Sequence, residues 1–358
     1  MLTKRELKLL EKVTQIDAIS GLEKDLAAFI KGELSKYGFT LVKDNLGSIF
    51  GVKKSKTNNA PRIMVGSHMD EVGFMVLDIS ENGIMKAEAR GGISTNTLLS
   101  QRVRLTLDNG TKLNGSIGAL APHLGGTSVD KLKISDLDFD FGFTSKAEAL
   151  AAGVKIGQMI VVDGPFHVLN GGQRLLAKAF DNRYGVFMML EMARHFQNIE
   201  LPYDLYVGAT VQEEVGLRGA ETIADVINPD FAIVLDCSPA RDTISKTEEG
   251  QLGGGVLIRY LDRSMIAFPE LLSYQEKSAS KVKVPYQYYS SMGGTDAGAF
   301  HLHANGVLTL THCICARSLH TAATIVDTND IKGAKKVLIH MLKDLNAEKI
   351  AEFRRYRR

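Results

Sequence analysis

Side chains that can bind a metal ion or move a proton stand directly after three apolar runs of this 358-residue chain. The runs cover residues 63–66, 205–209 and 231–235, and each is typical of a buried strand. The polar residues that follow them are His68 and Asp70, Glu213 and Glu214, and Asp236. Because ligands bind beyond the carboxyl ends of strands in open α/β sheets, we expect these side chains at one edge of one sheet.

Two further residues complete a set that is typical of a dinuclear metal site. Asp181 stands at a predicted helix start, and His320 follows a predicted strand near residue 310. Two histidines and three carboxylates are what a pair of divalent cations with one shared carboxylate requires, and a further carboxylate remains for general-base catalysis. Taken singly, each residue also has a structural interpretation: Asp181 could cap a helix, and Glu213-Glu214 could form a solvated helix N-terminus. The chemical interpretation rests on the residues as a set.

Strand and helix patterns alternate through the first and last parts of the chain. Further apolar runs of strand length occur at 256–258 and 307–310, and helical periodicity covers 184–196, 265–280 and 330–346. This alternation predicts an α/β fold, a mostly parallel mixed sheet with helices on both faces. Such a sheet would carry the candidate site residues just after its strands.

The segment after Asp70 has a different pattern. Apolar and polar residues alternate over 102–107, and Glu81-Asn82-Gly83 and Asp108-Asn109-Gly110 are typical of hairpin turns. We therefore predict a small β-rich, barrel-like domain inserted into the α/β domain. The predicted organisation is an α/β domain in two parts, residues 1–70 and 165–358, with the β-rich domain inserted between them at residues 71–164.

Two helices are expected to precede the first strand of the α/β domain. Apolar residues between Leu2 and Ile16 follow one helical stripe, and a second stripe begins after Ser20-Gly21-Leu22-Glu23. That tetrapeptide predicts a capping box, in which Ser20 and Glu23 each bind the other's backbone N–H group. Tyr37-Gly38 is expected to end the second helix, because glycine tolerates a positive φ.

The composition excludes several classes of protein. A net charge of +2 gives no general attraction for nucleic acid or anionic lipid, and the basic run 354–358 is interpreted as a solvated helix end. No apolar run approaches the ~18 residues of a membrane span, and the N-terminus lacks the apolar core of a signal peptide. Three cysteines cannot form a disulfide framework and indicate a reducing compartment. We expect a cytoplasmic protein without nucleic-acid or membrane partners.

The ordered motifs resemble those of the dinuclear metallo-aminopeptidases. The motifs are, in chain order, His68-x-Asp70, Phe180-Asp181-Asn182-Arg183, Glu213-Glu214-Val215-Gly216-Leu217-Arg218-Gly219-Ala220, Asp236, Gly293-Gly294-Thr295-Asp296-Ala297-Gly298 and His320. With the insertion directly after His-x-Asp, they make the chain similar to the glutamyl aminopeptidase branch, which includes the tetrahedral (TET) aminopeptidases. The resemblance extends from Ser20 to His320, and the chain departs from the family's usual His-Ser-Pro after His320.

The resemblance implies two divalent metal ions per subunit. Asp181 would bridge both metals, His68 and Asp236 would complete one site, and Glu214 and His320 would complete the other. Histidine and carboxylate ligands suit zinc, with cobalt and manganese as alternatives.

The resemblance also implies a metal-dependent aminopeptidase, an exopeptidase that removes the N-terminal residue from peptides. Glu213 would be the general base for a metal-activated water molecule, and Asp70 would orient His68. Relatives with this insertion associate through it into dimers, and several build a hollow tetrahedral dodecamer. We therefore expect peptide substrates and a homo-oligomer whose building block is a dimer and whose full assembly is a dodecamer.

Three alternatives belong to other classes. A related metal-dependent hydrolase of N-acyl amino acids would use the same ligands. A metal-independent glycoside hydrolase of the endoglucanase type could use Glu213 and Asp236 as its acid pair, but this leaves both histidines without a role. A non-catalytic relative would keep the fold as a binding module. Sensitivity to a chelator separates the metal-dependent readings from the glycosidase.

Overall fold

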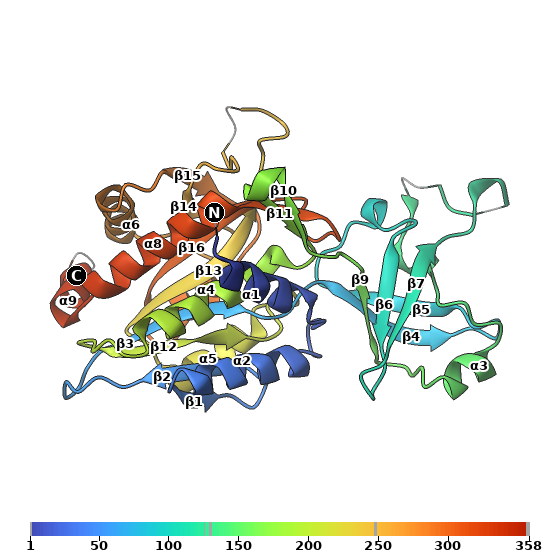
Figure 1. Cartoon of the computed structure of the whole chain (residues 1–358), viewed down its shortest axis with the longest axis horizontal. Coiled ribbons are helices and arrows are strands. Elements are labelled where there is room, and N and C mark those ends of the chain that lie inside the picture. The colour runs from blue at the N-terminus through green and yellow to red at the C-terminus, as the bar shows by residue number, and fades with distance from the viewer. Residues whose placement is uncertain (1, 125, 129–130, 247–248, 356–358) are drawn as a thin grey trace.

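The structure, a computed structural model of the chain, describes residues 2–124, 126–128, 131–246 and 249–355. It contains a large mixed sheet with helices on both faces and, beside it, a closed antiparallel barrel (Figure 1). The predicted α/β fold with an inserted β-rich, barrel-like domain is confirmed.

The large sheet has 11 strands among the described residues. In chain order they are β1 (Thr40–Lys43), β2 (Ile49–Lys53), β3 (Arg62–His68), β10 (His167–Leu169), β11 (Arg174–Ala177), β12 (Asp204–Thr210), β13 (Phe231–Pro239), β14 (Val256–Leu261), β15 (Tyr286–Ser290), β16 (Leu308–Arg317) and β17 (Thr324–Asp327). The spatial order is β1-β2-β12-β3-β13-β16-β17-β11-β10, with β14 joined to β16 and β15 to β14. The central strands β12, β3, β13 and β16 are parallel, whereas the pairs flanking this centre along that order are antiparallel. The parallel centre is therefore where several strands end at the same edge.

Helices cover both faces of this sheet (Figure 1). They are α1 (Lys4–Gln15), α2 (Lys24–Lys36), α4 (Phe180–Phe196), α5 (Arg218–Ile227), α6 (Pro269–Lys281), α7 (Asp296–Leu302), α8 (Thr328–Asp344) and α9 (Ala347–Arg355). Ile63 and Val65 pack into the apolar cluster that includes α1, α2, α4 and α8, and Met64 packs with α5 and α7. Because successive strand residues face opposite sides, the uninterrupted apolar run 63–65 fits a strand buried on both faces.

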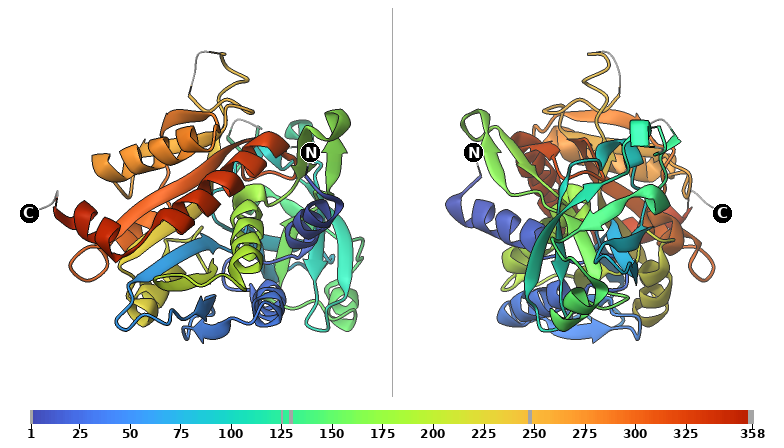
Figure 2. Two further views of the ribbon diagram at one scale, coloured as in Figure 1. Left: turned by 60° about the vertical axis from the view of Figure 1, so that its left-hand side comes forward. Right: turned by 90° about the vertical axis from the view of Figure 1, so that its right-hand side faces the viewer.

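The barrel is formed by six strands in the order β4-β5-β8-β7-β6-β9, and it lies in front of the sheet domain in the right-hand view of Figure 2. Its elements are β4 (Gly73–Ile79), β5 (Met85–Arg90), β6 (Arg102–Thr106), β7 (Lys112–Gly118), β8 (Asp138–Asp140), α3 (Lys146–Ala151) and β9 (Met159–Val162). The alternation predicted over 102–107 is β6, and its buried residues Val103 and Leu105 join a separate core with Phe74 and Phe139. The division of the chain at residues 70 and 164 stays a prediction.

The N-terminal helices are present, but the predicted capping box is wrong. Helix α2 begins after Glu23, and the Glu23 side chain makes no capping hydrogen bond. Instead, Glu23 accepts hydrogen bonds from the N–H groups of Gly21 and Gln212, while the Ser20 hydroxyl donates to Asp70. Partners distant in the chain have replaced the local ones. The expected helix end is confirmed, since α2 ends beside Gly38, whose φ is +77°.

Buried ion pairs join the barrel to the sheet domain. Arg104 on β6 donates to both carboxylate oxygens of Asp17, at 2.6 and 2.9 Å, and Lys112 on β7 donates to the same carboxylate at 2.6 Å. Burial of Asp17 opposes its ionisation, but Arg104 and Lys178 outweigh this and lower its pKa below the usual range. Charged contacts therefore fix the barrel against the segment between α1 and α2.

No helix of the described residues is long and apolar enough to cross a membrane. Arg354 and Arg355 of the basic run end α9, and Tyr356–Arg358 lie outside the described residues. The cytoplasmic location expected from the sequence stays a prediction.

Candidate metal centre

The parallel centre of the sheet brings the sequence-predicted residues to one edge. β3 ends at His68, which is paired in register with Thr210 at the end of β12. β13 runs parallel to β3, and Val234 is the last residue of β13 that is paired with β3. Asp236 lies two residues further along β13. Glu213 and Glu214 follow β12 after a bend at Gln212, whose φ is +55°. The carboxyl ends of three parallel strands thus supply most of the site, as the sequence predicted.

Asp181 lies between the two histidines. Its Oδ1 is 3.3 Å from Nε2 of His68, and its Oδ2 is 3.3 Å from Nε2 of His320. Asp181 stands near the start of α4, where the backbone is not yet helical. Asn182 anchors this turn, because its amide donates to the carbonyl of Leu235 at 2.7 Å. One carboxylate therefore faces a different imidazole with each of its oxygens.

His320 is held from both sides of its ring. Its Nε2 lies 3.3 Å from Oε1 of Glu214, and its Nδ1 lies 2.6 Å from the carbonyl oxygen of Gly92, to which it can donate. This contact directs Nε2 toward the carboxylates, as the backbone partners of metal-binding histidines do. Gly91, the residue before Gly92, has φ +88°. A Cβ atom on Gly91 would lie 2.6 Å from the Val72 side chain and 3.1 Å from that of Glu214. The sequence analysis missed this loop, since a carbonyl acceptor has no sequence signature.

Asp236 and Glu213 approach the same nitrogen of His68 as Asp181 does. Nε2 of His68 is 3.8 Å from Oδ1 of Asp236 and 3.9 Å from Oε2 of Glu213. The candidate ligand atoms of His68, Glu213 and Asp236 lie within 4.8 Å of one another, and so do those of His68, Asp181 and Glu214. The predicted base and four of the five predicted ligands thus form two overlapping groups that share His68, while His320 contacts Asp181 and Glu214 of the second group.

Asp70 supports this site through its backbone and its side chain. Its carbonyl oxygen lies 3.1 Å from Nδ1 of His68, while its carboxylate is 3.5 Å from that nitrogen. The carboxylate also accepts the N–H groups of Glu213 and Glu214 at 3.0 and 3.1 Å, and the hydroxyl of Ser20 at 2.6 Å. Asp70 therefore connects the end of β3 to the turn that carries both glutamates.

Burial and crowding shift the protonation of these groups. Burial and neighbouring carboxylates raise the pKa of Glu213 and of Asp236 well above the usual range. Burial opposes the charged form of His320, but Asp181 and Glu214 raise its pKa to about 11. Conversely, both histidines outweigh burial and lower the pKa of Asp181.

The donor set fits divalent cations. Two imidazoles and several carboxylates converge, and the buried Glu214 Oε1 accepts no hydrogen bond in the described part of the chain. Crowded carboxylates repel one another unless protons or cations lie between them. Imidazole and carboxylate are also the ligand types that zinc, cobalt and manganese accept.

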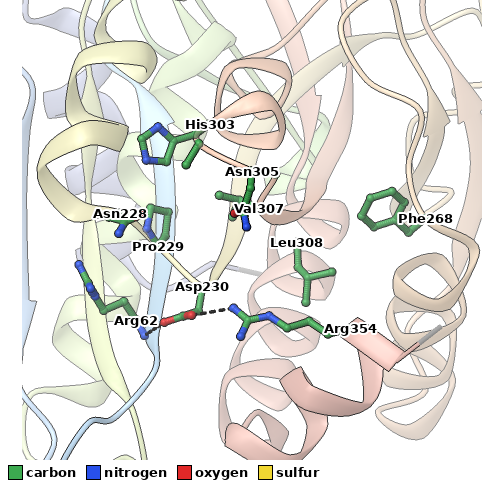
Figure 3. A pocket seen from close by; sticks show the side chains of 12 residues that line it. Arg62, Asn228, Pro229, Asp230, Phe268, His303, Asn305, Val307, Leu308 and Arg354 are labelled. Atoms are coloured by element: carbon green, nitrogen blue, oxygen red, sulfur yellow. Dashed lines mark hydrogen bonds and ion pairs between the residues drawn. The ribbon is translucent and has the colours of Figure 1, made fainter. Parts of the chain in front are cut away.

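A cavity lies at the opposite edge of the sheet, away from the candidate metal ligands (Figure 3). Its volume is about 530 Å³, and it is lined near the starts of β3, β13 and β16. Here Asp230 accepts a hydrogen bond from the backbone of Arg62 at 2.9 Å and one from the Arg354 side chain at 2.7 Å. The cavity contains none of the candidate metal ligands and does not form part of the metal site.

Comparison with known proteins agrees with this geometry. Residues 47–337 match the family model described as M42 glutamyl aminopeptidase. A glutamyl aminopeptidase of Lactococcus lactis subsp. cremoris is 40% identical over 98% of this chain and 100% of its own length. The solved structure of a TET aminopeptidase from a marine sediment thaumarchaeon has a TM-score of 0.92 at 34% identity, covering 98% of this chain and 99% of that one. A Pyrococcus horikoshii TET1 peptidase, described as able to assemble into a tetrahedron or a large octahedral shell, has a TM-score of 0.85 at 30% identity, covering 95% and 100%. The chain belongs to the M42 glutamyl aminopeptidase family.

Proposed function

We propose that this chain is a dinuclear metal-dependent aminopeptidase that removes the N-terminal residue from peptides. The observation that carries the proposal is the position of Asp181, whose two carboxylate oxygens each lie 3.3 Å from a different histidine. A carboxylate in this position is suited to bridge two cations. The family match and the glutamyl aminopeptidase relative support the reaction class.

For the ligands we propose the division that the sequence resemblance implies. His68 and Asp236 would hold one divalent ion, Glu214 and His320 would hold the other, and Asp181 would touch both. When bound, the ions would polarise the scissile carbonyl and lower the pKa of a bound water molecule. Zinc is the proposed metal, with cobalt and manganese as alternatives.

Glu213 is the proposed general base. It follows β12 beside the proposed ligands, and its Oε2 lies 3.9 Å from Nε2 of His68. Burial raises its pKa in the metal-free protein, and bound cations would oppose this shift and favour the ionised form that accepts a proton. Glu213 would take a proton from water and later deliver it to the amine that leaves.

The proposal that this chain forms a homo-oligomer rests on the assembly of its relatives, and not on contacts within one chain. The TET1 relative assembles into a tetrahedron or an octahedral shell. We propose that this chain forms a dodecamer of the tetrahedral kind, built from dimers that associate through the barrel domain. Light scattering of an active preparation tests this, and an active monomer would contradict it.

The activity is tested with a panel of aminoacyl reporter substrates, each assayed with zinc, cobalt or manganese. Because the Lactococcus relative is a glutamyl aminopeptidase, the panel begins with glutamyl and aspartyl substrates. The expected result is release of the reporter that a chelator abolishes and added metal restores. Release from N-acetylated substrates alone would favour the N-acyl hydrolase, and glycoside cleavage that survives the chelator would favour the glycosidase.

A further inference from the structure

Glu23 contacts the turn that carries Glu213 and Glu214, although it lies nearly two hundred positions earlier in the chain. Its Oε1 accepts the N–H group of Gln212 at 3.1 Å and that of Gly21 at 2.8 Å. The side chain is buried, with 6% of the residue exposed. Neither contact caps α2, so the side chain is directed to the turn rather than to its own helix.

The residue that Glu23 holds has a costly backbone conformation. Gln212 has φ +55°, in the left-handed region that residues other than glycine rarely adopt. This bend turns the chain from the end of β12 toward Glu213 and Glu214. A conformation of this kind persists only where the surroundings fix it.

Two carboxylates receive the three successive N–H groups of this turn. Glu23 accepts from residue 212, and Asp70 accepts from residues 213 and 214. Ser20, three positions before Glu23, donates to Asp70 at 2.6 Å, so one short segment contacts both supports of the turn. Asp70 was expected from its spacing to His68, but Glu23 has no such relation to any predicted ligand.

We propose that Glu23 is a positioning residue for catalysis, which holds the bend at Gln212 and thereby fixes where Glu213 and Glu214 lie relative to Asp181 and His320. The inference rests on the proposed function for the roles of the two glutamates. Within the described part of the chain, Glu23 makes no hydrogen bond or ion pair with a candidate ligand side chain, so it acts through the backbone N–H group of Gln212. The hydrogen bond from Gln212 requires an acceptor oxygen at the distance that the Glu23 side chain spans, and it does not require a negative charge.

The distinction between reach and charge makes the proposal testable. Glu23→Gln keeps the length and an acceptor oxygen but removes the charge. Glu23→Asp keeps the charge but is one methylene shorter, and Glu23→Ala removes the acceptor. Glu33→Ala, a change on the same helix α2 away from the turn, serves as the matched control. Thermal unfolding of each variant shows which are folded, and Glu23→Asp replaces Glu23→Ala if the alanine variant does not fold.

Two readouts are measured, the apparent zinc affinity by titration and kcat with KM at saturating metal. We expect Glu23→Asp and Glu23→Ala to lower kcat and zinc affinity about 10–100-fold, as loss of support around a metal ligand does, with KM little changed. Glu23→Gln and Glu33→Ala should stay within about threefold of the wild type. Equal zinc affinity and kcat in all variants, or equal losses in Glu23→Gln and Glu23→Asp, would overturn the proposal.

The zinc titration separates this inference from the proposed function. If the wild type binds zinc but releases no N-terminal residue, the proposed activity fails while the affinities of the Glu23 variants still decide the positioning role. If the wild type is an active aminopeptidase and Glu23→Ala matches it in both readouts, the positioning role alone fails.

Discussion

The two edges of the central sheet use charge in opposite ways. At the edge where β3, β12 and β13 end, carboxylates crowd around two histidines, and burial raises the pKa of Glu213 and Asp236. At the edge where these strands begin, Asp230 is matched by the backbone of Arg62 and the side chain of Arg354. At the beginning edge Asp230 finds its partners among the chain's own residues, whereas the ending edge is where we propose that cations bind. The comparison shows how one sheet can provide a structural edge and a functional edge.

The largest effect is expected for Asp181→Ala, which removes the carboxylate between the two histidines. Both proposed ions lose a ligand, so the metal content should fall from two per chain and the activity should disappear. Elemental analysis of the purified variant measures this. Asp225→Ala, at an exposed carboxylate, is the control and should keep both metals. Two metals per chain in Asp181→Ala would contradict the bridging assignment.

Glu213→Gln should separate proton transfer from metal binding. The amide keeps the size of the side chain but cannot accept a proton at neutral pH, so kcat should fall ~10²–10⁴-fold while the metal content stays near that of the wild type. Glu214→Gln is the matched variant and should instead lose metal. If Glu213→Gln stays active and Glu214→Gln keeps its metals, the two roles are reversed or wrong.

Removing the metals should reverse the pH dependence of stability. The raised pKa values of Glu213 and Asp236 mean that their ionised forms cost stability, and proton uptake relieves this cost as the pH falls. The raised pKa of His320, about 11, acts in the same direction, since its contribution is full below ~6.5 and is lost as the pH rises. Chelated protein should therefore have a higher Tm at pH 6 than at pH 8.

Metal-loaded protein should show the opposite trend, because protons compete with metals for the ligands. Differential scanning fluorimetry at pH 6, 7 and 8, with and without chelator, measures both slopes. If Tm changes with pH in the same direction in the chelated and the metal-loaded protein, the proposal that the carboxylates at this edge need bound cations is contradicted.

The smallest effect is expected at the beginning edge. Arg354 pairs with Asp230 at 2.7 Å, and its side chain is 53% exposed. Exposed ion pairs contribute ~0.2–1 kcal/mol, so Arg354→Ala should lower the free energy of unfolding by no more than about 1 kcal/mol and leave kcat and the metal content unchanged. Urea unfolding and the reporter assay provide the two measurements. A loss of activity would show that the two edges are coupled.

The sequence predicted the elements of the fold and the members of the site better than it predicted how they are held. Apolar runs identified the central strands because burial on both faces leaves a strong local pattern, and the residues after those runs do converge. The capping box at Ser20 and Glu23 was wrong, since both side chains bind groups that are distant in the chain. Local pattern cannot show such partners.

Backbone partners were beyond prediction for a related reason. Every residue has a carbonyl and nearly every residue an N–H group, so composition does not mark Gly92 as the acceptor for His320 or Gln212 as the donor to Glu23. Two cysteines show the opposite case, in which spacing along a strand is enough to bring side chains together. Cys313 and Cys315, two positions apart on β16, lie in one small buried cluster, because side chains at i and i+2 share one face of a strand.

The hydrogen bond from His320 to Gly92 joins residues 228 positions apart and crosses from the catalytic part of the chain to the loop after β5. A shortened protein made by joining residue 70 directly to residue 165 would keep every proposed metal ligand and lose the acceptor for His320. The segment after β5 would therefore contribute to the proposed metal site as well as to the fold. Any redesign that replaces the barrel must provide a carbonyl at that position.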